Sequence, residues 1–239
     1  MFFTTSPAMD GFGAQYQRII CQYIILTENN KKFHYTPFTT VEHNYDNSSL
    51  WITKLENLIN LKYNIPIINK NNKYQVVNLG IIFKKFESEI DKYCDSKSMQ
   101  FIKNCFWKNK ERNVFKNDKI NIAVHVRRPN AHDSRLEGAN TPDPYYLNIM
   151  KIIREKYKDK NLLFHIYSQG NPANFKKYES EDVQFHINED ICKTFIGMVA
   201  ADILVTSASS FSYVAALLND GEVYYKNFWH KPRKGWNIY

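Results

Sequence analysis

The sequence predicts an α/β fold whose C-terminal half is a parallel, doubly wound sheet. From Lys119 onward, short apolar segments rich in β-branched residues alternate with longer segments of helical periodicity. This alternation is the pattern of parallel strands joined by helices. The chain has 239 residues, of which 44% are hydrophobic and 23% are charged, so it can bury a substantial core.

We expect two domains, an N-terminal α/β domain over residues 1–117 and a C-terminal domain over residues 118–239. In the first, strands are expected at 2–5 and 33–38. Helices are expected from Ala14 after a glycine loop, over 50–61 with Ser49 as cap, and over 98–108. Two apolar pieces, 74–79 and 81–86, have no clear periodicity.

The second domain has a more regular pattern. Its strand candidates are 120–126, 162–167, 183–187, 203–206 and 222–225. Its helix candidates are 143–157, 171–178, 190–201 and 210–218.

The chain is basic, with a formal charge of +8 and a pI near 9.1. A nucleic acid, an anionic membrane surface or a phosphate-bearing small molecule could each explain this excess. Many lysines fall in Lys/Asn clusters, near Asn69 and Lys108, that are typical of exposed turns. Nucleic-acid binding is therefore the less favoured explanation.

Targeting and metal signals are weak in this sequence. The longest apolar runs are too short to cross a bilayer, and the first residues lack the pattern of a signal peptide. The four cysteines are scattered without metal-binding spacing, which favours free thiols in a reducing compartment. We expect a soluble, cytoplasmic protein with no membrane span and no bound metal.

The segment IAVHVRR, residues 122–128, is the first candidate for a functional site. Ile122, Val124 and Val126 predict a buried strand, which ends in Arg127 and Arg128. Ligands of α/β sheets sit at the carboxyl ends of strands, and guanidinium groups grip phosphates with paired hydrogen bonds. The alternative is an edge strand that ends in two solvated arginines.

The second candidate is the segment 201–218, ADILVTSASSFSYVAALL. A short strand is followed by five hydroxyl side chains at the start of a helix: Thr206, Ser207, Ser209, Ser210 and Ser212. Hydroxyls and unpaired N–H groups at a helix N-terminus form a phosphate site. Any single serine here could instead be an ordinary helix cap.

A glycine loop, DGFGAQYQRI, provides a weaker signal near the N-terminus. Gly11 and Gly13 precede a helix, whose free N–H groups could bind an anion. A plain turn would explain the same two glycines equally well.

These three motifs, in this order, resemble those of the fucosyltransferase superfamily, which includes α-1,2-, α-1,6- and protein O-fucosyltransferases. HVRR after a strand resembles their HxRR motif, SSFSYVAALL resembles their TFS-type turn, and DGFGAQ resembles their first glycine loop. The stretch 29–118 has no recognisable counterpart.

The resemblance implies a GT-B-like fold with two Rossmann-like halves. The N-terminal half would be the acceptor side, and the C-terminal half would bind the nucleotide sugar. It implies an inverting, metal-independent transfer of fucose from GDP-fucose to a glycan or glycoconjugate hydroxyl, with no cofactor.

The resemblance also implies roles for individual residues. Arg127 would bind the β-phosphate and stabilise the leaving group, while Arg128 would support the fold or the phosphate. The other implied donor contacts are His125, Ser209, Ser210, Phe211, Ser212, Gly11, Gly13 and Gln15. Asp190 would read guanine, with Asp202 as the competing candidate.

The sequence departs from the family pattern directly after HVRR, where Pro129 and Asn130 replace a small residue and aspartate. An acceptor hydroxyl needs a nearby base or hydrogen-bond acceptor. Asp133 and Glu137 lie on the following loop, together with His132, and are equal candidates for this catalytic role. The alternative is a transfer that uses no enzymic base. The missing aspartate keeps open the alternative of a non-catalytic glycan- or nucleotide-binding protein.

Overall fold

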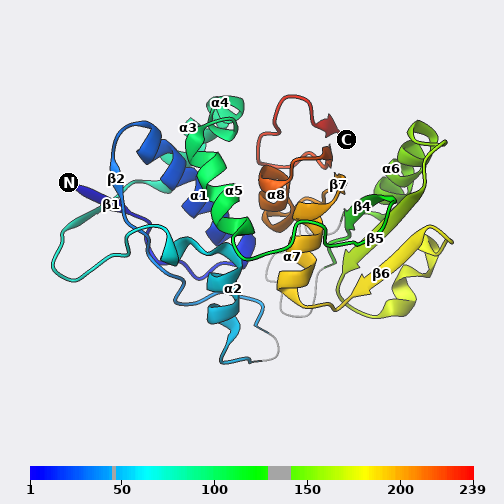
Figure 1. Cartoon of the computed structure of the whole chain (residues 1–239), viewed down its shortest axis with the longest axis horizontal. Coiled ribbons are helices and arrows are strands. Elements are labelled where there is room, and N and C mark those ends of the chain that lie inside the picture. The colour runs from blue at the N-terminus through cyan, green and yellow to red at the C-terminus, as the bar shows by residue number, and fades with distance from the viewer. Residues whose placement is uncertain (45–46, 129–140) are drawn as a thin grey trace. The chain divides into compact units, whose positions relative to one another are not determined.

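The computed structural model describes residues 1–44, 47–128 and 141–239 and divides into two compact units, Met1–Glu111 and Arg112–Tyr239. Both units contain helices and a parallel sheet, so the predicted α/β class is confirmed (Figure 1). The boundary between the two units falls between Glu111 and Arg112, whereas the sequence pattern predicts a domain boundary after residue 117.

Unit 2 contains a six-stranded sheet in the order β6-β5-β4-β7-β8-β9, in which every neighbouring pair is parallel. Its strands are β4 (Ile120–His125), β5 (Leu162–Ser168), β6 (Val183–Ile187), β7 (Ile203–Val205), β8 (Glu222–Tyr225) and β9 (Asn237–Ile238). Counted along the chain of this unit, the order is 3-2-1-4-5-6, which is that of the Rossmann fold. The strand order reverses between β4 and β7, and we call this place the switch point.

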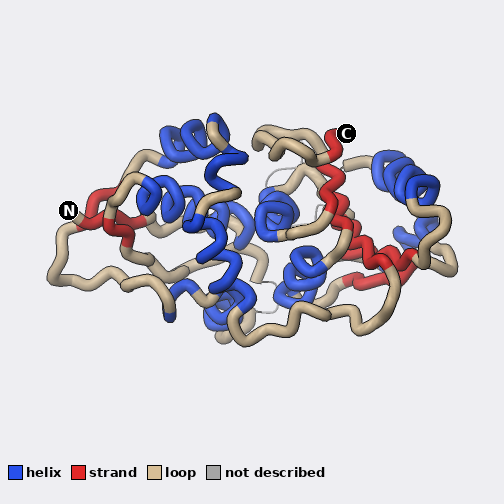
Figure 2. Tube along the Cα trace, turned by 45° about the horizontal axis from the view of Figure 1, so that its top comes forward, coloured by secondary structure: helices blue, strands red, loops and turns tan. Residues whose placement is uncertain are grey.

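Helices cover both faces of this sheet. Helix α6 (Asp143–Lys156) lies on one face, and α7 (Ile191–Ala200) and α8 (Ser210–Leu218) lie on the other (Figures 1 and 2). Side chains alternate along β4, so Ile122, Val124 and Val126 share one apolar core with α6. The intervening His125 points to the α8 side, where its ring lies 5.5 Å from that of Phe211.

Two elements of unit 2 differ from the prediction. Residues Pro172–Tyr178 form a 3-10 helix, not an α-helix, which begins at a proline capped by Asn171. The short strand β9 was not predicted, because two residues carry no periodicity. It is held by backbone pairing with Tyr224 and Tyr225, so the end of the C-terminal tail lies on the sheet.

Unit 1 contains a three-stranded parallel sheet in the order β2-β1-β3. Its strands are β1 (Phe2–Thr4), β2 (Lys32–Phe33) and β3 (Tyr74–Val76). Its helices are α1 (Phe12–Glu28), α2 (Trp51–Ile59), the 3-10 turn η1 (Leu61–Tyr63), α3 (Leu79–Ser88), α4 (Ile90–Cys94) and α5 (Lys97–Trp107). Because α1 follows the central strand directly, its apolar side is buried along its length.

Two predictions in unit 1 need correction, and one apolar piece that had no predicted structure lies in a helix. The strand expected over 33–38 ends at Phe33, and beyond it Tyr35 makes only an isolated bridge to Ile67. Ser49 does not cap α2, since the Leu50 N–H bonds to the Ser48 hydroxyl 3.3 Å away. The apolar piece 81–86 lies within α3, which Asn78 caps through the Ile81 N–H.

None of the four cysteines, all of which are described, forms a disulfide, and Cys21, Cys94 and Cys105 are buried. Among the described residues, no helix is both long enough and apolar enough to cross a membrane.

The turn between α8 and β8 tolerates no side chain at Gly221. A Cβ there would lie 2.2 Å from the carbonyl oxygen of Asp202, which also accepts the Glu222 N–H. We expect Gly221→Ala to lower the free energy of unfolding by about 2–3 kcal/mol, as overpacking against backbone does. Denaturant unfolding measures this value. Asp220→Ala, at the exposed neighbouring position, should change it by no more than about 0.5 kcal/mol, and equal effects of both changes would contradict the account.

Candidate functional site

The carboxyl ends of β4 and β7 lie side by side at the switch point of unit 2. The two strands pair in parallel, with Ile122 opposite Ile203 and Val124 opposite Val205. Ligands of open parallel sheets bind outside the carboxyl ends of the strands at this place. The sheet therefore brings together the two segments that the sequence selected, HVRR after β4 and the hydroxyl-rich turn after β7.

A hydrogen bond joins these two segments. His125 Nδ1 lies 2.9 Å from the hydroxyl of Ser207, and both residues are buried. Burial, and secondly the charge of Arg127, lowers the pKa of His125 to about 3. The imidazole is therefore neutral at physiological pH, and its partner is a side chain of the turn.

The two arginines have different surroundings. Arg128 donates to the carbonyl oxygen of Thr141 at 3.1 Å and forms an ion pair with Asp143 at the start of α6. Lys177 and Tyr178 bind the same carboxylate. These bonds hold the pKa of Asp143 below its ordinary value, against the opposing effect of its partial burial. Arg128 thus joins the end of β4 to α6.

Arg127 lies on the other side of the extended chain. Alternation places it on the face of His125, and its charge contributes to the lowered pKa of that imidazole. It is partly exposed at the carboxyl edge. Of the two guanidinium groups, that of Arg127 is therefore the one on the side of the hydroxyl-rich turn.

The hydroxyl groups of the turn are not equivalent. Ser212 is fully buried, and its Oγ accepts the Ser207 N–H at 3.3 Å. Ser209 caps α8 by accepting the Phe211 N–H at 3.3 Å. Ser210, the first residue of α8, is partly exposed, as is Phe211. The buried hydroxyls shape the turn, and Ser210 remains accessible at the helix N-terminus.

Asp190 and Asp202, the two candidates for guanine recognition, lie at opposite edges of the sheet. Asp202 precedes β7 and accepts the Asn121 N–H at 2.8 Å, so it belongs to the amino edge, away from the site. Asp190 follows β6 at the carboxyl edge and caps α7 through the N–H groups of Cys192 and Lys193. The cap gives Asp190 a structural role, and its contact with guanine stays a prediction.

The glycine loop lies in unit 1, between β1 and α1. Gly11 is the N-cap of α1, and a Cβ on it would approach the ring of His43 to 3.0 Å. Gly13 is buried in the first turn of the helix. The amide nitrogen of Gln15 donates to the carbonyl oxygens of Asp10 and Thr40, at 2.6 and 2.7 Å. These contacts hold the loop together, and a role in donor binding stays a prediction for all three residues.

A polar pocket also lies in unit 1, beyond the carboxyl ends of β1 and β2. Its wall includes Ser6, Gln15, Arg18, Thr36 and Phe38. Arg18 forms an ion pair with Asp10 of the glycine loop. The wall thus combines hydroxyl and amide groups with one aromatic ring and a neutralised charge.

The catalytic candidates Asp133 and Glu137, like His132, lie outside the described residues. In the described part of the chain, no three His, Cys, Asp or Glu side chains gather as a metal site requires.

Sequence reasoning missed the partners that fix the site. The sequence pattern marks Asp143 only as the start of a helix. An acidic residue in the first turn of the helix that follows HVRR was the available signal for an arginine partner. Thr206 was grouped with the serines. In the structure its hydroxyl accepts the Lys226 N–H at 2.9 Å, which ties the ends of β7 and β8. Nothing in the sequence marked that pairing.

No protein-family model matches the sequence, and no curated protein matches it. Similar solved structures include two that contain GDP. One is NodZ α-1,6-fucosyltransferase co-crystallised with GDP, with 10% identity, a TM-score of 0.45 and coverage of 91% of this chain and 92% of that chain. The other is POFUT1 in complex with GDP, with 11% identity, a TM-score of 0.47 and coverage of 92% and 94%. The Rossmann-like topology of unit 2 is assigned from its own strand order, β6-β5-β4-β7-β8-β9.

The lowered pKa of His125 predicts acid sensitivity. The unfolded chain binds a proton near pH 6.5 and the folded chain only near pH 3, so stability is lost as pH falls below 6.5. Between pH 7 and pH 5 this single group should lower the free energy of unfolding by about 2 kcal/mol. In His125→Asn the loss over that interval should be smaller by this amount, measured by urea unfolding at both pH values. An unchanged loss would show that His125 accepts a proton in the fold.

Ser210 and Ser212 should respond differently to removal of the hydroxyl. Ser212→Ala removes the acceptor of a buried N–H, so it should lower the free energy of unfolding by about 1–3 kcal/mol. Ser210→Ala should leave stability nearly unchanged and weaken binding of GDP by about 1 kcal/mol. Guanosine, which has no phosphate, serves as the control ligand in calorimetry. Equal weakening of GDP and guanosine by Ser210→Ala would contradict a phosphate contact.

Proposed function

We propose that this chain is an inverting, metal-independent glycosyltransferase that transfers fucose from GDP-fucose to a glycan hydroxyl. The observation that carries the proposal is the parallel pairing of β4 with β7. It places Arg127 and the turn at Thr206–Ser212 at the same carboxyl edge, joined by the bond between His125 and Ser207. The motif resemblance supports GDP-fucose as the donor.

The diphosphate would be held by two kinds of group. The N-terminus of α8 is the positive end of its helix dipole, which favours an anion. Arg127 adds a permanent charge whose fork geometry matches phosphate oxygens. Ser210 adds a hydroxyl at the same helix start.

Arg127 is the group that would assist the departure of GDP. Negative charge grows on the β-phosphate as the glycosidic bond breaks, and a fixed cation stabilises that charge in the transition state. His125 does not fill this role, because its imidazole is neutral and already bonded to Ser207. A neutral His125 also adds no second positive charge beside Arg127.

The remaining roles follow from the motifs. Asp133 or Glu137 would accept the proton of the acceptor hydroxyl while it attacks the anomeric carbon from the opposite side, which inverts the configuration. Asp190 would accept hydrogen bonds from the guanine edge. In unit 1, Gly11, Gly13 and Gln15 would contact the donor, and the polar pocket beside them would be the acceptor side.

Ligand-induced stabilisation tests the donor class. GDP should raise the melting temperature with EDTA present, in proportion to ln(1 + [L]/Kd), because the proposed site uses arginine and backbone N–H groups. UDP with Mn²⁺ should give a much smaller shift. Stabilisation by UDP with Mn²⁺ but not by GDP would refute the proposed donor. Loss of all shifts at moderate salt, together with tight binding to DNA, would favour a nucleic-acid-binding protein.

The two arginines provide a matched pair for testing transfer. Arg127→Lys keeps the charge and loses the two-pronged contact, so kcat should fall by about a hundredfold or more, comparable to the loss of one oxyanion donor. The Kd for GDP should rise much less. Arg128→Lys should act mainly through the melting temperature, because its partner Asp143 lies on α6.

The measurement is kcat, the Kd for GDP and the melting temperature for both variants. An Arg127→Lys protein with normal kcat would remove this residue from the mechanism. A wild-type protein that binds GDP but neither transfers nor hydrolyses GDP-fucose would favour the non-catalytic alternative.

A further inference from the structure

The loop that follows β8 places one tryptophan in solvent. Trp229 is 62% exposed, although most rings of the same segment are packed against their neighbours. Its two ring contacts, with Phe228 and His230, meet at 67° and 65°. Neither neighbour stacks parallel on the indole, and 62% of the residue's surface remains open to a ligand.

Hydrogen bonds from two tyrosine hydroxyls hold this loop in place. The hydroxyl of Tyr225 donates to the carbonyl oxygen of His230 at 2.6 Å, and that of Tyr213 donates to the carbonyl oxygen of Lys231 at 2.9 Å. The ring of Tyr213 also stacks on that of His230, with centroids 4.9 Å apart. The backbone on the C-terminal side of Trp229 is therefore anchored, and little conformational entropy would be lost when a ligand binds the indole.

The loop starts at the same carboxyl edge as the candidate site. Lys226 follows β8 directly, and its N–H donates to the hydroxyl of Thr206 at the start of the turn. Trp229 is the third residue after Lys226, so their Cα atoms are at most about 10 Å apart. The backbone of Trp229 lies within that distance of a residue bonded to the turn.

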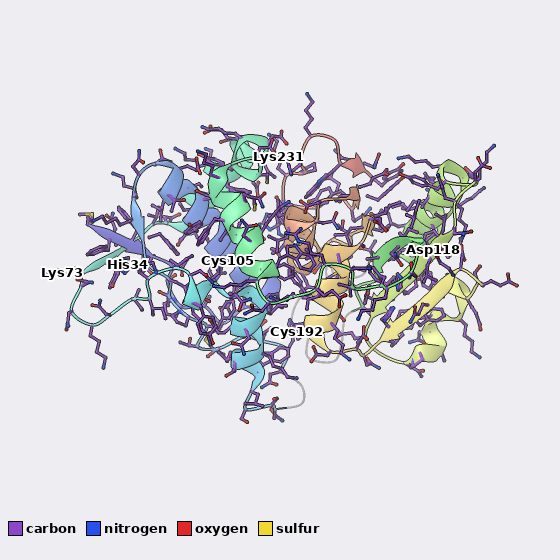
Figure 3. All side chains as sticks on the ribbon, in the orientation of Figure 1. His34, Lys73, Cys105, Asp118, Cys192 and Lys231 are labelled. Carbon is purple, nitrogen blue, oxygen red and sulfur yellow. The ribbon has the colours of Figure 1, made fainter. Side chains whose placement is uncertain are left out.

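We propose that the acceptor is an oligosaccharide and that Trp229 is a stacking platform for one of its sugar rings. This proposal rests on the proposed function. A pyranose has one face of C–H groups that packs on an electron-rich ring, and hydroxyl groups around its rim. Trp229 offers the ring, and exposed Asn227 and Lys231 on either side offer hydrogen-bond donors (Figure 3 labels Lys231).

An oligosaccharide fits this loop better than a protein surface does. Protein interfaces are built around a contiguous, fully buried cluster of apolar anchors. The exposed residues nearest to Trp229 along the loop, Asn227 and Lys231, are instead polar, and the next tryptophan, Trp236, packs against Tyr225. From residue 223 to the C-terminus the chain carries no aspartate or glutamate, so acidic as well as neutral sugars can approach.

Binding of the full-length protein to an array of immobilised neutral and acidic oligosaccharides, with GDP present, tests the proposal. Trp229→Ala should weaken the strongest wild-type glycan signal by about tenfold or more, as loss of an aromatic anchor does. Trp229→Phe, which keeps a ring, should retain most of it. Tyr63→Ala is the matched control, since Tyr63 is 64% exposed and lies in unit 1. It should bind as the wild type does.

GDP-induced thermal stabilisation, measured on the same samples, separates this proposal from the proposed function. All four proteins should keep the GDP shift. If no protein shows a GDP shift while glycan binding still depends on Trp229, the donor proposal fails and the stacking platform stands. The platform is overturned if Trp229→Ala binds glycans as the wild type does, if that variant loses the GDP shift, or if the wild type binds no oligosaccharide on the array.

Discussion

The parallel pairing of β4 with β7 is the constraint on which the candidate site depends. The two strands are separated by most of the sequence of unit 2, yet their registered backbone bonds bring both carboxyl ends to one place. The groups of unit 2 that are proposed to bind phosphate all follow one of these two strands. The hydrogen bond between His125 and Ser207 then fixes the two ends relative to each other at 2.9 Å.

Buried polar groups around this pairing determine which residues remain available for a ligand. Ser212 and Ser209 satisfy N–H groups of the turn, and Arg128 is held by Asp143. Each of these bonds uses a side chain that could otherwise bind a ligand, and each also holds the rest of the site in a fixed geometry. Under the proposed function, such rigidity would let Arg127 and the start of α8 stabilise developing charge without reorganisation during the reaction.

Much of the C-terminal unit could be predicted from the sequence, and the reason is local. The strands at 183–187 and 222–225 and the helix at 210–218 were predicted with their observed bounds, because strong apolar periodicity and turn residues mark them. In unit 1 the sheet is short, and β2 has only two residues, so tertiary contacts decide where it ends. Ser49 is not the cap because α2 begins one residue later than predicted, with Leu50 at the cap position.

The sequence predicted the motifs of the candidate site, but it did not predict which of their residues are structural and which are available to a ligand. Alternation along β4 assigns Arg127 and Arg128 to opposite faces, but only the structure shows that Asp143 receives Arg128. Five hydroxyls looked alike in the sequence. Burial distinguishes them, because a fully buried Ser212 bonds within the turn whereas Ser210 lies partly exposed at the helix start.

Hydrogen–deuterium exchange of the full-length protein with and without GDP tests the central claim most directly, because it reports where the nucleotide acts on the backbone. The account predicts that GDP slows exchange in the peptides that contain Arg127 and the segment 206–212, with guanosine giving less protection at the latter. Protection confined to other strands, with the segment 206–212 unchanged, would contradict the assignment of the nucleotide to the switch point.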